Sequence, residues 1–398
     1  MKDVYLFEAI RSPRTKAKAT GGLHSLAPPE LLSQLYRALE TRTGIDPHLI
    51  DEIVLGCVTQ HGEQAANLAK TSALFAGWPA SIAGLTVNRF CSSSIDAMAI
   101  SAMKIAAGHQ TAAVAGGIEM MSRVPLLADG ARVFSDSDYG IAHQVLLMGS
   151  GADLIATRVG ASRSDCDAVA VLSHQRAAVA QDEGRFQSIV PIQTESGVSD
   201  RDECIRRNMT AERFAALPPT FIELGEAGAD AVQLKAFGEL SAIEHVHTAG
   251  NSPAMCDAAA VVLMGDESLG DALGIPPKAK LVMSKTACGE PLEVVSGCVA
   301  ATQAIMRDAG MSISDIDVFE IHEAFAATIV KAKQELHLDD ERLNVNGGCI
   351  ALGHPMGATG AIMMSTVLDE LIRSDQSLGL IAASGAAGSG SSILVERC

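Results

Sequence analysis

The chain has 398 residues and a formal net charge of −17, so a polyanionic partner such as nucleic acid is not expected. Hydrophobic residues make up 48% of the sequence and aromatic residues only 4%, with 36 glycines, a mixture that suits helices packed closely on strands. No apolar run reaches the roughly 18 residues that a membrane span requires. The length allows two domains with sizeable cores.

The cysteines and the first residues indicate the compartment. Nine cysteines without paired spacing favour a reducing environment over a disulfide framework. No cysteine and histidine have the spacing of zinc ligands, so we expect no metal site. The segment Met1–Glu8 predicts a first strand rather than a signal peptide. We therefore expect a cytoplasmic protein.

Strands and helices alternate over the first 120 residues. The apolar patterns predict strands at 3–9, 52–58, 84–88 and 112–116, and helices at about 29–43, 65–76 and 93–107. From about 121 to 248 the alternation loosens into charged helical pieces and connections rich in proline and glycine. We expect this stretch to be an excursion that serves a binding site. Regular alternation resumes after Thr248.

A short internal similarity suggests a duplicated α/β unit. The run Asn344–Cys349 echoes Thr86–Cys91, and each is followed by small residues, a helical stretch and an apolar strand that runs into glycine. These strands are Ala112–Gly117 and Leu380–Gly385. Two halves with the same order of elements indicate two similar domains.

Cys91 lies where a strand is predicted to turn into a helix. Apolar residues precede it up to Val87, and apolar residues recur at helical spacing from Ile95 onward. A helix N-terminus offers free N–H groups and partial positive charge, which would lower the pKa of the thiol from about 8.5. The same pattern alone also fits a buried structural cysteine at a helix cap.

A glycine-rich stretch, Gly347–Gly360, surrounds His354 and matches neither a P-loop nor a dinucleotide fingerprint. Glycine permits turns that hold a side chain at a fixed point in a cleft, where this histidine could ionise a nucleophilic cysteine. A second histidine, His322, follows a predicted strand and would by itself be a helix-cap residue. Asn251 would by itself be a turn residue.

Taken together, these segments resemble the thiolase family, the acyl-CoA acetyltransferases, over essentially the whole chain. The motifs that carry the resemblance occur in the family's order: Ala9–Pro13, the Cys91 run, Gly116–Ser122, Ser173–Ala177, Thr248–Ser252, His322–Ala326 and Gly353–Pro355. The resemblance implies an α/β, thiolase-like fold of two similar αβα halves stacked as five layers, with an inserted loop domain. It implies an N-terminal domain at 1–120 plus 249–270, a coenzyme A-binding loop domain at 121–248 and a C-terminal domain at 271–398.

The resemblance also implies roles for individual residues. Cys91 would take the acyl group, His354 would activate it, and His322 with His354 would hold a water that stabilises the thioester enolate. The backbone N–H groups of Cys91 and Ala386 would form a second oxyanion hole. Ser252 and Arg213 would contact coenzyme A, which enters as free coenzyme A or acyl-CoA substrate rather than as a permanently bound cofactor.

The sequence departs from the family pattern at two site positions. Many thiolases have asparagine where this chain has His322, and the histidine form resembles the β-subunits of fatty-acid oxidation complexes. Ser384 stands where thiolases place a second cysteine, which moves a proton on the substrate α-carbon or on coenzyme A. A serine hydroxyl is far less acidic than a thiol, so this position predicts slow proton transfer.

The coenzyme A-binding region departs as well. The stretch Glu223–His247 is longer than in short biosynthetic thiolases, and the family serine expected on the pantetheine arm is replaced near Pro253. These features leave the preferred length of the substrate's acyl chain open.

The function implied is thiolytic cleavage of 3-ketoacyl-CoA to acetyl-CoA and a shortened acyl-CoA, or the reverse condensation. The alternatives are an acetoacetyl-CoA thiolase and a thiolase-like acyl-CoA-binding protein with low turnover. A ketoacyl synthase is disfavoured by the Gly353–Pro355 loop. We expect a homodimer or homotetramer, with the apolar strand 112–116 continuing a sheet across a two-fold axis, and possible membership of a fatty-acid oxidation complex.

Overall fold

The computed structural model describes residues 1–398 and contains one large mixed sheet. Its ten strands follow the order β10-β11-β12-β9-β1-β8-β5-β3-β4, with the short β2 beside β8. The strands are β1 (Tyr5–Arg11), β2 (Thr15–Lys16), β3 (Glu52–Gly56), β4 (Ala83–Val87), β5 (Ala112–Met120), β8 (Cys256–Gly265), β9 (Ala279–Cys288), β10 (Val318–Ile321), β11 (Leu378–Ser384) and β12 (Ser389–Arg397).

The sheet consists of two halves with the same pairing. In the first half, β3 is parallel to β4 and β5, and β5 is antiparallel to β8. In the second half, β10 is parallel to β11, which is antiparallel to β12, and Leu343 pairs with Phe319 where β4 stands in the first half. The halves join through Tyr5 and Leu6 of β1, which pair with β9. The predicted duplication is therefore confirmed.

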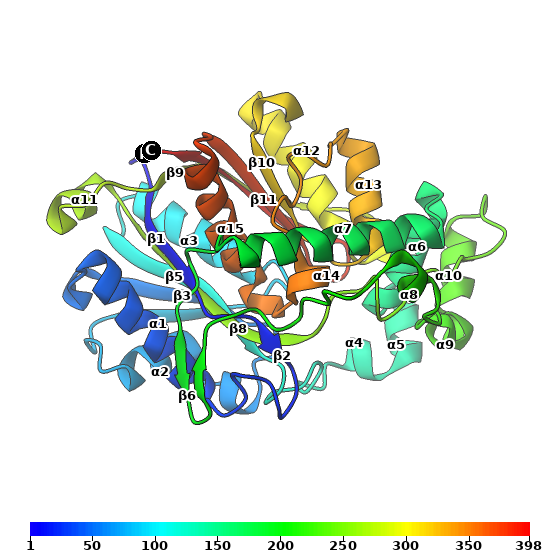
Figure 1. The fold of residues 1–398 in the computed structure, drawn as a ribbon, viewed down its shortest axis with the longest axis horizontal. Coiled ribbons are helices and arrows are strands. Elements are labelled where there is room, and N and C mark those ends of the chain that lie inside the picture. The colour runs from blue at the N-terminus through cyan, green and yellow to red at the C-terminus, as the bar shows by residue number, and fades with distance from the viewer.

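The helices complete five layers, as expected (Figure 1). Helices α1 (Pro28–Thr43) and α2 (Leu68–Phe75) cover the outer face of the first half of the sheet. Helices α3 (Ser93–Ala106) and α15 (Thr359–Ser374) lie between the two halves. Helices α12 (Gly297–Ala309) and α13 (Ala326–Leu336) cover the outer face of the second half. The α/β, thiolase-like architecture is confirmed.

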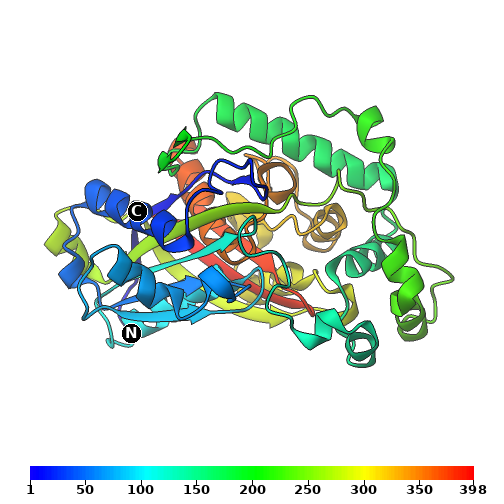
Figure 2. The same ribbon diagram turned by 90° about the horizontal axis from the view of Figure 1, so that it is seen from below.

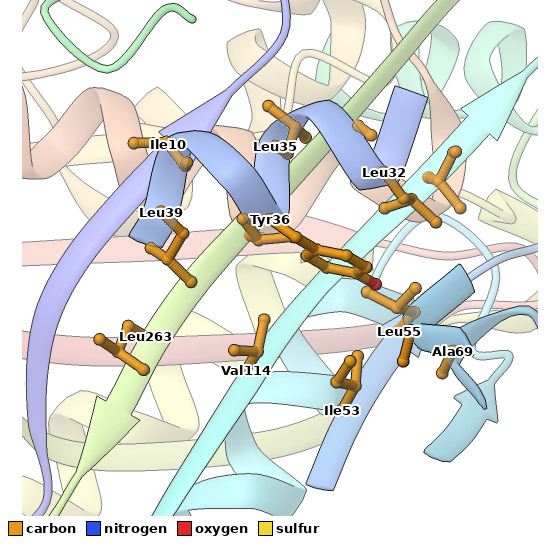
Figure 3. Packing of buried hydrophobic residues seen from close by; sticks show 14 of the residues in the cluster. Ile10, Leu32, Leu35, Tyr36, Leu39, Ile53, Leu55, Ala69, Val114 and Leu263 are labelled. Atoms are coloured by element: carbon orange, nitrogen blue, oxygen red, sulfur yellow. The ribbon is translucent and has the colours of Figure 1, made fainter. Parts of the chain in front are cut away.

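The outer core of the first half follows from the helical spacing of apolar residues in α1. Leu32, Leu35, Tyr36 and Leu39 recur every three or four residues, so they share one face of the helix. Figure 3 shows this face pointing at the apolar side chains of β3, β5 and β8. The strand residues in contact with it include Ile53, Leu55, Val114 and Leu263.

Small residues let the central helices approach their neighbours closely. A Cβ atom at Gly56 of β3 would lie 2.5 Å from the backbone nitrogen of Ser94 in α3. A Cβ atom at Gly360 of α15 would lie 2.4 Å from Cγ1 of Ile95. No side chain fits at either distance, so glycine at these positions sets the spacing that places the starts of α3 and α15 together.

The segment 121–248 contributes no strand to the main sheet, as the loosened pattern predicted. It is nevertheless rich in helix, because α7 alone runs for 20 residues. Figures 1 and 2 show most of its helices on one side of the molecule, where α7 packs against α13 and α14 (Cys349–Leu352), whereas Gln193 of β6 is hydrogen-bonded to Gln34 of α1. Its elements are α4 (Arg132–Ser135), α5 (Ser137–Ala142), α6 (Met148–Val159), α7 (Arg163–Asp182), β6 (Ile192–Thr194), β7 (Gly197–Ser199), α8 (Ala211–Ala215), α9 (Ile222–Leu224), a π-helical turn (Gly225–Ala229) and α10 (Asp230–Ala236).

Three expectations need correction. Helix α2 begins at Leu68 rather than near 65, because Ala66 and Asn67 have positive φ angles of 57° and 51°. The first strand begins at Tyr5 rather than at residue 3. Strand β5 cannot continue the sheet across a two-fold axis, since β3 and β8 occupy both of its edges; the free edge belongs to β4.

The remaining helices are short: α11 (Glu267–Leu273) and α14 (Cys349–Leu352). Crossing a bilayer takes a longer and more apolar helix than any in this fold.

Candidate active site

Cys91 lies in the turn between β4 and α3. The turn is tightened by Phe90, whose backbone has a φ of 50° and whose N–H donates to Oδ1 of Asn88 at 2.8 Å. The next residue, Ser92, is the N-cap of α3, and its hydroxyl donates to the carbonyl of Ala383 at 2.9 Å. Cys91 is thereby held against the C-terminal end of β11, in the other half of the fold.

His354 lies against Cys91, as the sequence predicted. Its backbone N–H donates to the carbonyl of Ala254 at 2.8 Å, which fixes the loop between α14 and α15. One ring nitrogen, Nδ1, lies 2.8 Å from Oγ1 of Thr359, and the other, Nε2, lies 3.1 Å from Sγ of Cys91. A base within hydrogen-bond reach of a thiol is the arrangement that nucleophilic catalysis requires.

The resting thiol is not activated by the helix, contrary to the expectation from sequence. Burial, with a smaller contribution from the charge of Glu119, raises the pKa of Cys91 to about 12. Burial also lowers the pKa of His354 well below its ordinary value, with His322 and Arg14 adding to the effect. Cys91 precedes the N-cap, so it gains little from the helix. Both shifts favour the neutral forms, the thiol of Cys91 and the uncharged imidazole of His354.

His322 lies beside His354. It directly follows β10, its N–H donates to the carbonyl of Ala382 at 2.9 Å, and its ring centroid lies 4.3 Å from that of His354. The side chain is 1% exposed, and neither ring nitrogen has a hydrogen-bond partner. Burial lowers its pKa to about 4, so the neutral ring can donate one hydrogen bond and accept another.

Two backbone N–H groups near Cys91 are free. Neither the N–H of Cys91 nor that of Ala386 donates to another residue. The segment around Ala386 packs closely on the Cys91 turn, since a Cβ atom at Gly385 would lie 2.9 Å from the carbonyl oxygen of Arg89. Free N–H groups beside a nucleophile could stabilise a developing oxyanion.

Ser384 ends β11 and is fully buried. Its hydroxyl oxygen accepts a hydrogen bond from the backbone N–H of Cys298, at the start of α12, with a distance of 2.9 Å. Ser384 does not line the cavity that contains Cys91. The hydroxyl is therefore occupied on the side that faces α12.

A largely apolar cavity of about 390 Å³ opens onto Cys91, His322 and His354. The residues that line it come from both halves and from the segment 121–248, including Met121, Leu126, Leu127, Leu147, Met148, Phe221, Leu224, Ser252, Pro253, Met255, Val295 and Phe325. Ser252 lines this cavity, and its hydroxyl has no hydrogen-bond partner. Arg213 lies on the exposed face of α8, outside this cavity, and donates to the carbonyl of Asn208.

Glu119 at the end of β5 supports the site, although sequence analysis gave it no role. Its carboxylate accepts hydrogen bonds from the backbone N–H groups of Val58, Thr59 and Gly357 at 3.0–3.1 Å, and from the side chain of Gln64 at 2.8 Å. It thereby ties the loop after β3 to the turn that follows His354. Its place in the Gly116–Ser122 motif was the only signal in the sequence.

Glu323, next to His322, has a similar supporting role in the second half. One carboxylate oxygen accepts hydrogen bonds from the hydroxyl of Ser173 in α7 at 2.8 Å and from the N–H of Ile350 in α14 at 2.9 Å. It links two motifs that the sequence analysis singled out separately. Asn251 is also more than a turn residue: it is fully buried, and its side chain donates to Asp167 of α7 at 2.8 Å.

Comparison with known proteins agrees with this fold. The thiolase N-terminal domain matches residues 4–235 and the thiolase C-terminal domain matches residues 275–397. The chain is 34% identical to a 3-ketoacyl-CoA thiolase of Bacillus subtilis and 34% identical to one of Escherichia coli O139:H28, with 100% of each chain covered. The crystal structure of the Bacillus anthracis acetyl-CoA acetyltransferase superposes with a TM-score of 0.84 at 31% identity, covering 100% of this chain and 99% of that one.

The protein belongs to the thiolase family. It is an acyltransferase of the class that uses coenzyme A thioesters as substrates.

Proposed function

We propose that the protein cleaves 3-ketoacyl-CoA to acetyl-CoA and a shortened acyl-CoA, or runs the reverse condensation, through an acyl group on Cys91. The observation that carries this proposal is the contact of 3.1 Å between Cys91 Sγ and His354 Nε2 at a largely apolar cavity. As the substrate binds, His354 takes the thiol proton and the thiolate attacks the 3-keto carbonyl. The bond between C2 and C3 then breaks, leaving the acyl group on Cys91 and the enolate of acetyl-CoA.

His322 and His354 stabilise that enolate through a shared water. The partnerless ring nitrogens of His322 support this role, because a buried imidazole without a partner is costly unless a water or substrate supplies one. The proton that His354 took from Cys91 must reach the enolate before acetyl-CoA leaves. The thiol of free coenzyme A then gives its proton to His354 and attacks the acyl group, which releases the shortened acyl-CoA and the thiolate of Cys91. The N–H groups of Cys91 and Ala386 stabilise the oxyanion of the acyl-transfer steps.

The cavity favours 3-ketoacyl-CoA with more than four acyl carbons over acetoacetyl-CoA. Its lining is mainly leucine, methionine and phenylalanine, which suits an alkyl chain. Met148, Phe221 and Leu224 come from the segment 121–248, which supports a coenzyme A-binding loop domain there. We also propose two further domains, an N-terminal thiolase domain at 1–120 plus 249–270 and a C-terminal thiolase domain at 271–398. Coenzyme A would contact Ser252 and Arg213.

We place this activity in cytoplasmic fatty-acid β-oxidation, on a homodimer or homotetramer that could join a fatty-acid oxidation complex. Support comes from the relatives' name, 3-ketoacyl-CoA thiolase.

A second candidate is an acyl-CoA-binding protein with low turnover. The environment of Ser384 favours it, because the hydroxyl is engaged by Cys298 and lies outside the cavity. Steady-state turnover with acetoacetyl-CoA and with longer 3-ketoacyl-CoA substrates separates the two. If the protein binds coenzyme A thioesters but turns over none of these substrates, it is the acyl-CoA-binding protein of the second candidate.

A further inference from the structure

Three metal-ligating side chains meet beside Cys91 although they are dispersed in the sequence. His322 follows β10, Cys349 opens α14, and His354 lies in the loop after α14. One ligand atom from each lies within 4.8 Å of the other two. Sequence spacing alone gave no zinc pattern here, because His322 is separated from the other two residues by α13 and the loop that follows it.

The donor atoms of this cluster are available. Both ring nitrogens of His322 are buried without a partner, and Cys349, which is 3% exposed, makes no side-chain hydrogen bond. His354 has its Nδ1 held by the hydroxyl of Thr359, so its Nε2 is the nitrogen that faces the site. Metal-bound histidines are commonly oriented in this way, by a hydrogen bond to the ring nitrogen that does not bind the metal.

A fourth ligand is next to the cluster. Sγ of Cys91 lies 3.1 Å from Nε2 of His354. In a tetrahedral zinc site with bonds of about 2.0–2.3 Å, ligand atoms lie about 3.4–3.8 Å apart. His322, Cys349 and His354 already have ligand atoms within 4.8 Å of one another, whereas Sγ of Cys91 lies outside this group and must rotate toward it to reach the same ion. The cavity of about 390 Å³ reaches Cys91, His322 and His354 and offers a path of entry.

We propose that Cys91, His322, Cys349 and His354 form a binding site for a thiophilic divalent cation of the Zn²⁺ class. Two thiolates and two imidazoles are a ligand set suited to tetrahedral Zn²⁺, and two thiolates neutralise its charge in a buried site. The ion and an acyl group cannot occupy Cys91 together. Metal binding therefore masks the nucleophile. The inference concerns metal binding alone and does not depend on the proposed thiolase reaction.

The test uses the full chain, reduced with a phosphine and freed of metal. Titration with Zn²⁺ is followed by calorimetry, and titration with Co²⁺ by absorption. We expect one ion per chain and a cobalt spectrum with thiolate charge-transfer bands and the intense d–d bands of tetrahedral coordination. Cys349→Ala should weaken Zn²⁺ binding by about 100-fold or more, since even loss of an outer-shell partner costs 10–100-fold. Cys166→Ala, a buried cysteine in α7, is the matched control and should bind like the unaltered protein.

A second measurement needs no variant. Iodoacetamide labelling with peptide mass mapping should show that Zn²⁺ protects Cys91 while exposed Cys288 and Cys398 remain reactive. Absence of Zn²⁺ binding to the unaltered protein would overturn the proposal. So would unchanged affinity and cobalt spectrum in Cys349→Ala, or a Zn²⁺ complex in which Cys91 is labelled at its metal-free rate.

Discussion

The hydroxyl of Ser384 accepts a hydrogen bond from the N–H of Cys298, and this bond joins the end of β11 to the start of α12. The N–H is one of the donors that α12 cannot satisfy internally, so the serine acts as a cap from outside the helix. The position where thiolases carry a proton-transferring cysteine thus has a structural role here. Ser384 is therefore the clearest difference between this site and the pattern of the thiolase family.

Ser384→Cys should raise thiolysis turnover by at least an order of magnitude. A thiol is a weaker hydrogen-bond acceptor than a hydroxyl, so the side chain can leave Cys298 and turn toward the substrate, where one acid–base group contributes about 10²–10⁴-fold. Stopped-flow measurement should show that the rate of Cys91 acylation changes little. If the unaltered protein already turns over rapidly and the variant gains nothing, another group carries the proton, and His322 is the next candidate.

Glu119→Gln should destabilise the fold by about 2–4 kcal/mol, measured by urea unfolding. The carboxylate accepts five hydrogen bonds, one of them from the thiol of Cys57, whereas the amide NH₂ of glutamine would face at least two of the donors. Glu223→Gln, at an exposed position in α9, is the control and should unfold like the unaltered protein. Equal stability of the two variants would show that Glu119 does not hold the loops together.

The protein should be at least a dimer, assembled through the free edge of β4. The helices that flank this edge carry exposed apolar side chains: Phe75 of α2 is 55% exposed and Met103 of α3 is 59% exposed. Arginine at both positions should give the monomer mass of 41.3 kDa in light scattering, while Ile372→Arg, on α15, should remain oligomeric. A monomeric unaltered protein at micromolar concentration would disprove this assembly.

Asp369 predicts a pH dependence of stability. Burial raises its pKa to about 6, above the value near 4 of an unfolded aspartate. Between these values the unfolded chain releases the proton and the folded protein keeps it. The free energy of unfolding therefore falls as pH rises from about 4 to 6, and the destabilisation stays constant at higher pH. The loss is about 3 kcal/mol, since each pKa unit corresponds to about 1.4 kcal/mol.

Asp369→Asn removes this titration while its amide oxygen can still accept from the N–H and hydroxyl of Ser188. The difference in unfolding free energy between the two proteins should grow in favour of the variant from pH 4 to 7. A difference that stays constant over this range would exclude the raised pKa.

The sequence predicted the parts of this molecule that depend on local pattern. The alternation of strands and helices, the turn at Cys91 and the internal repeat all follow from spacing over a few residues. The contact between Cys91 and His354 was expected because each lies in a motif typical of such a site.

The remaining features depend on contacts between distant segments. The high pKa of Cys91 comes from burial and from Glu119, which no local pattern encodes. Cys349 joins the two histidines only because the fold returns the α14 loop to the end of β10. The free sheet edge was assigned to the strand at 112–116 rather than to β4, because the order of strands in a sheet is a property of the whole fold and not of local pattern.

Mass mapping of the acylated protein tests the central claim most directly. Incubation with acetyl-CoA, followed by digestion and peptide mass analysis, should place a thioester on Cys91 and on no other of the nine cysteines. Cys91 is the only cysteine whose thiol is hydrogen-bonded to a histidine ring, that of His354. A label mainly on Cys349 or Cys288, or full activity in Cys91→Ala, would contradict the account.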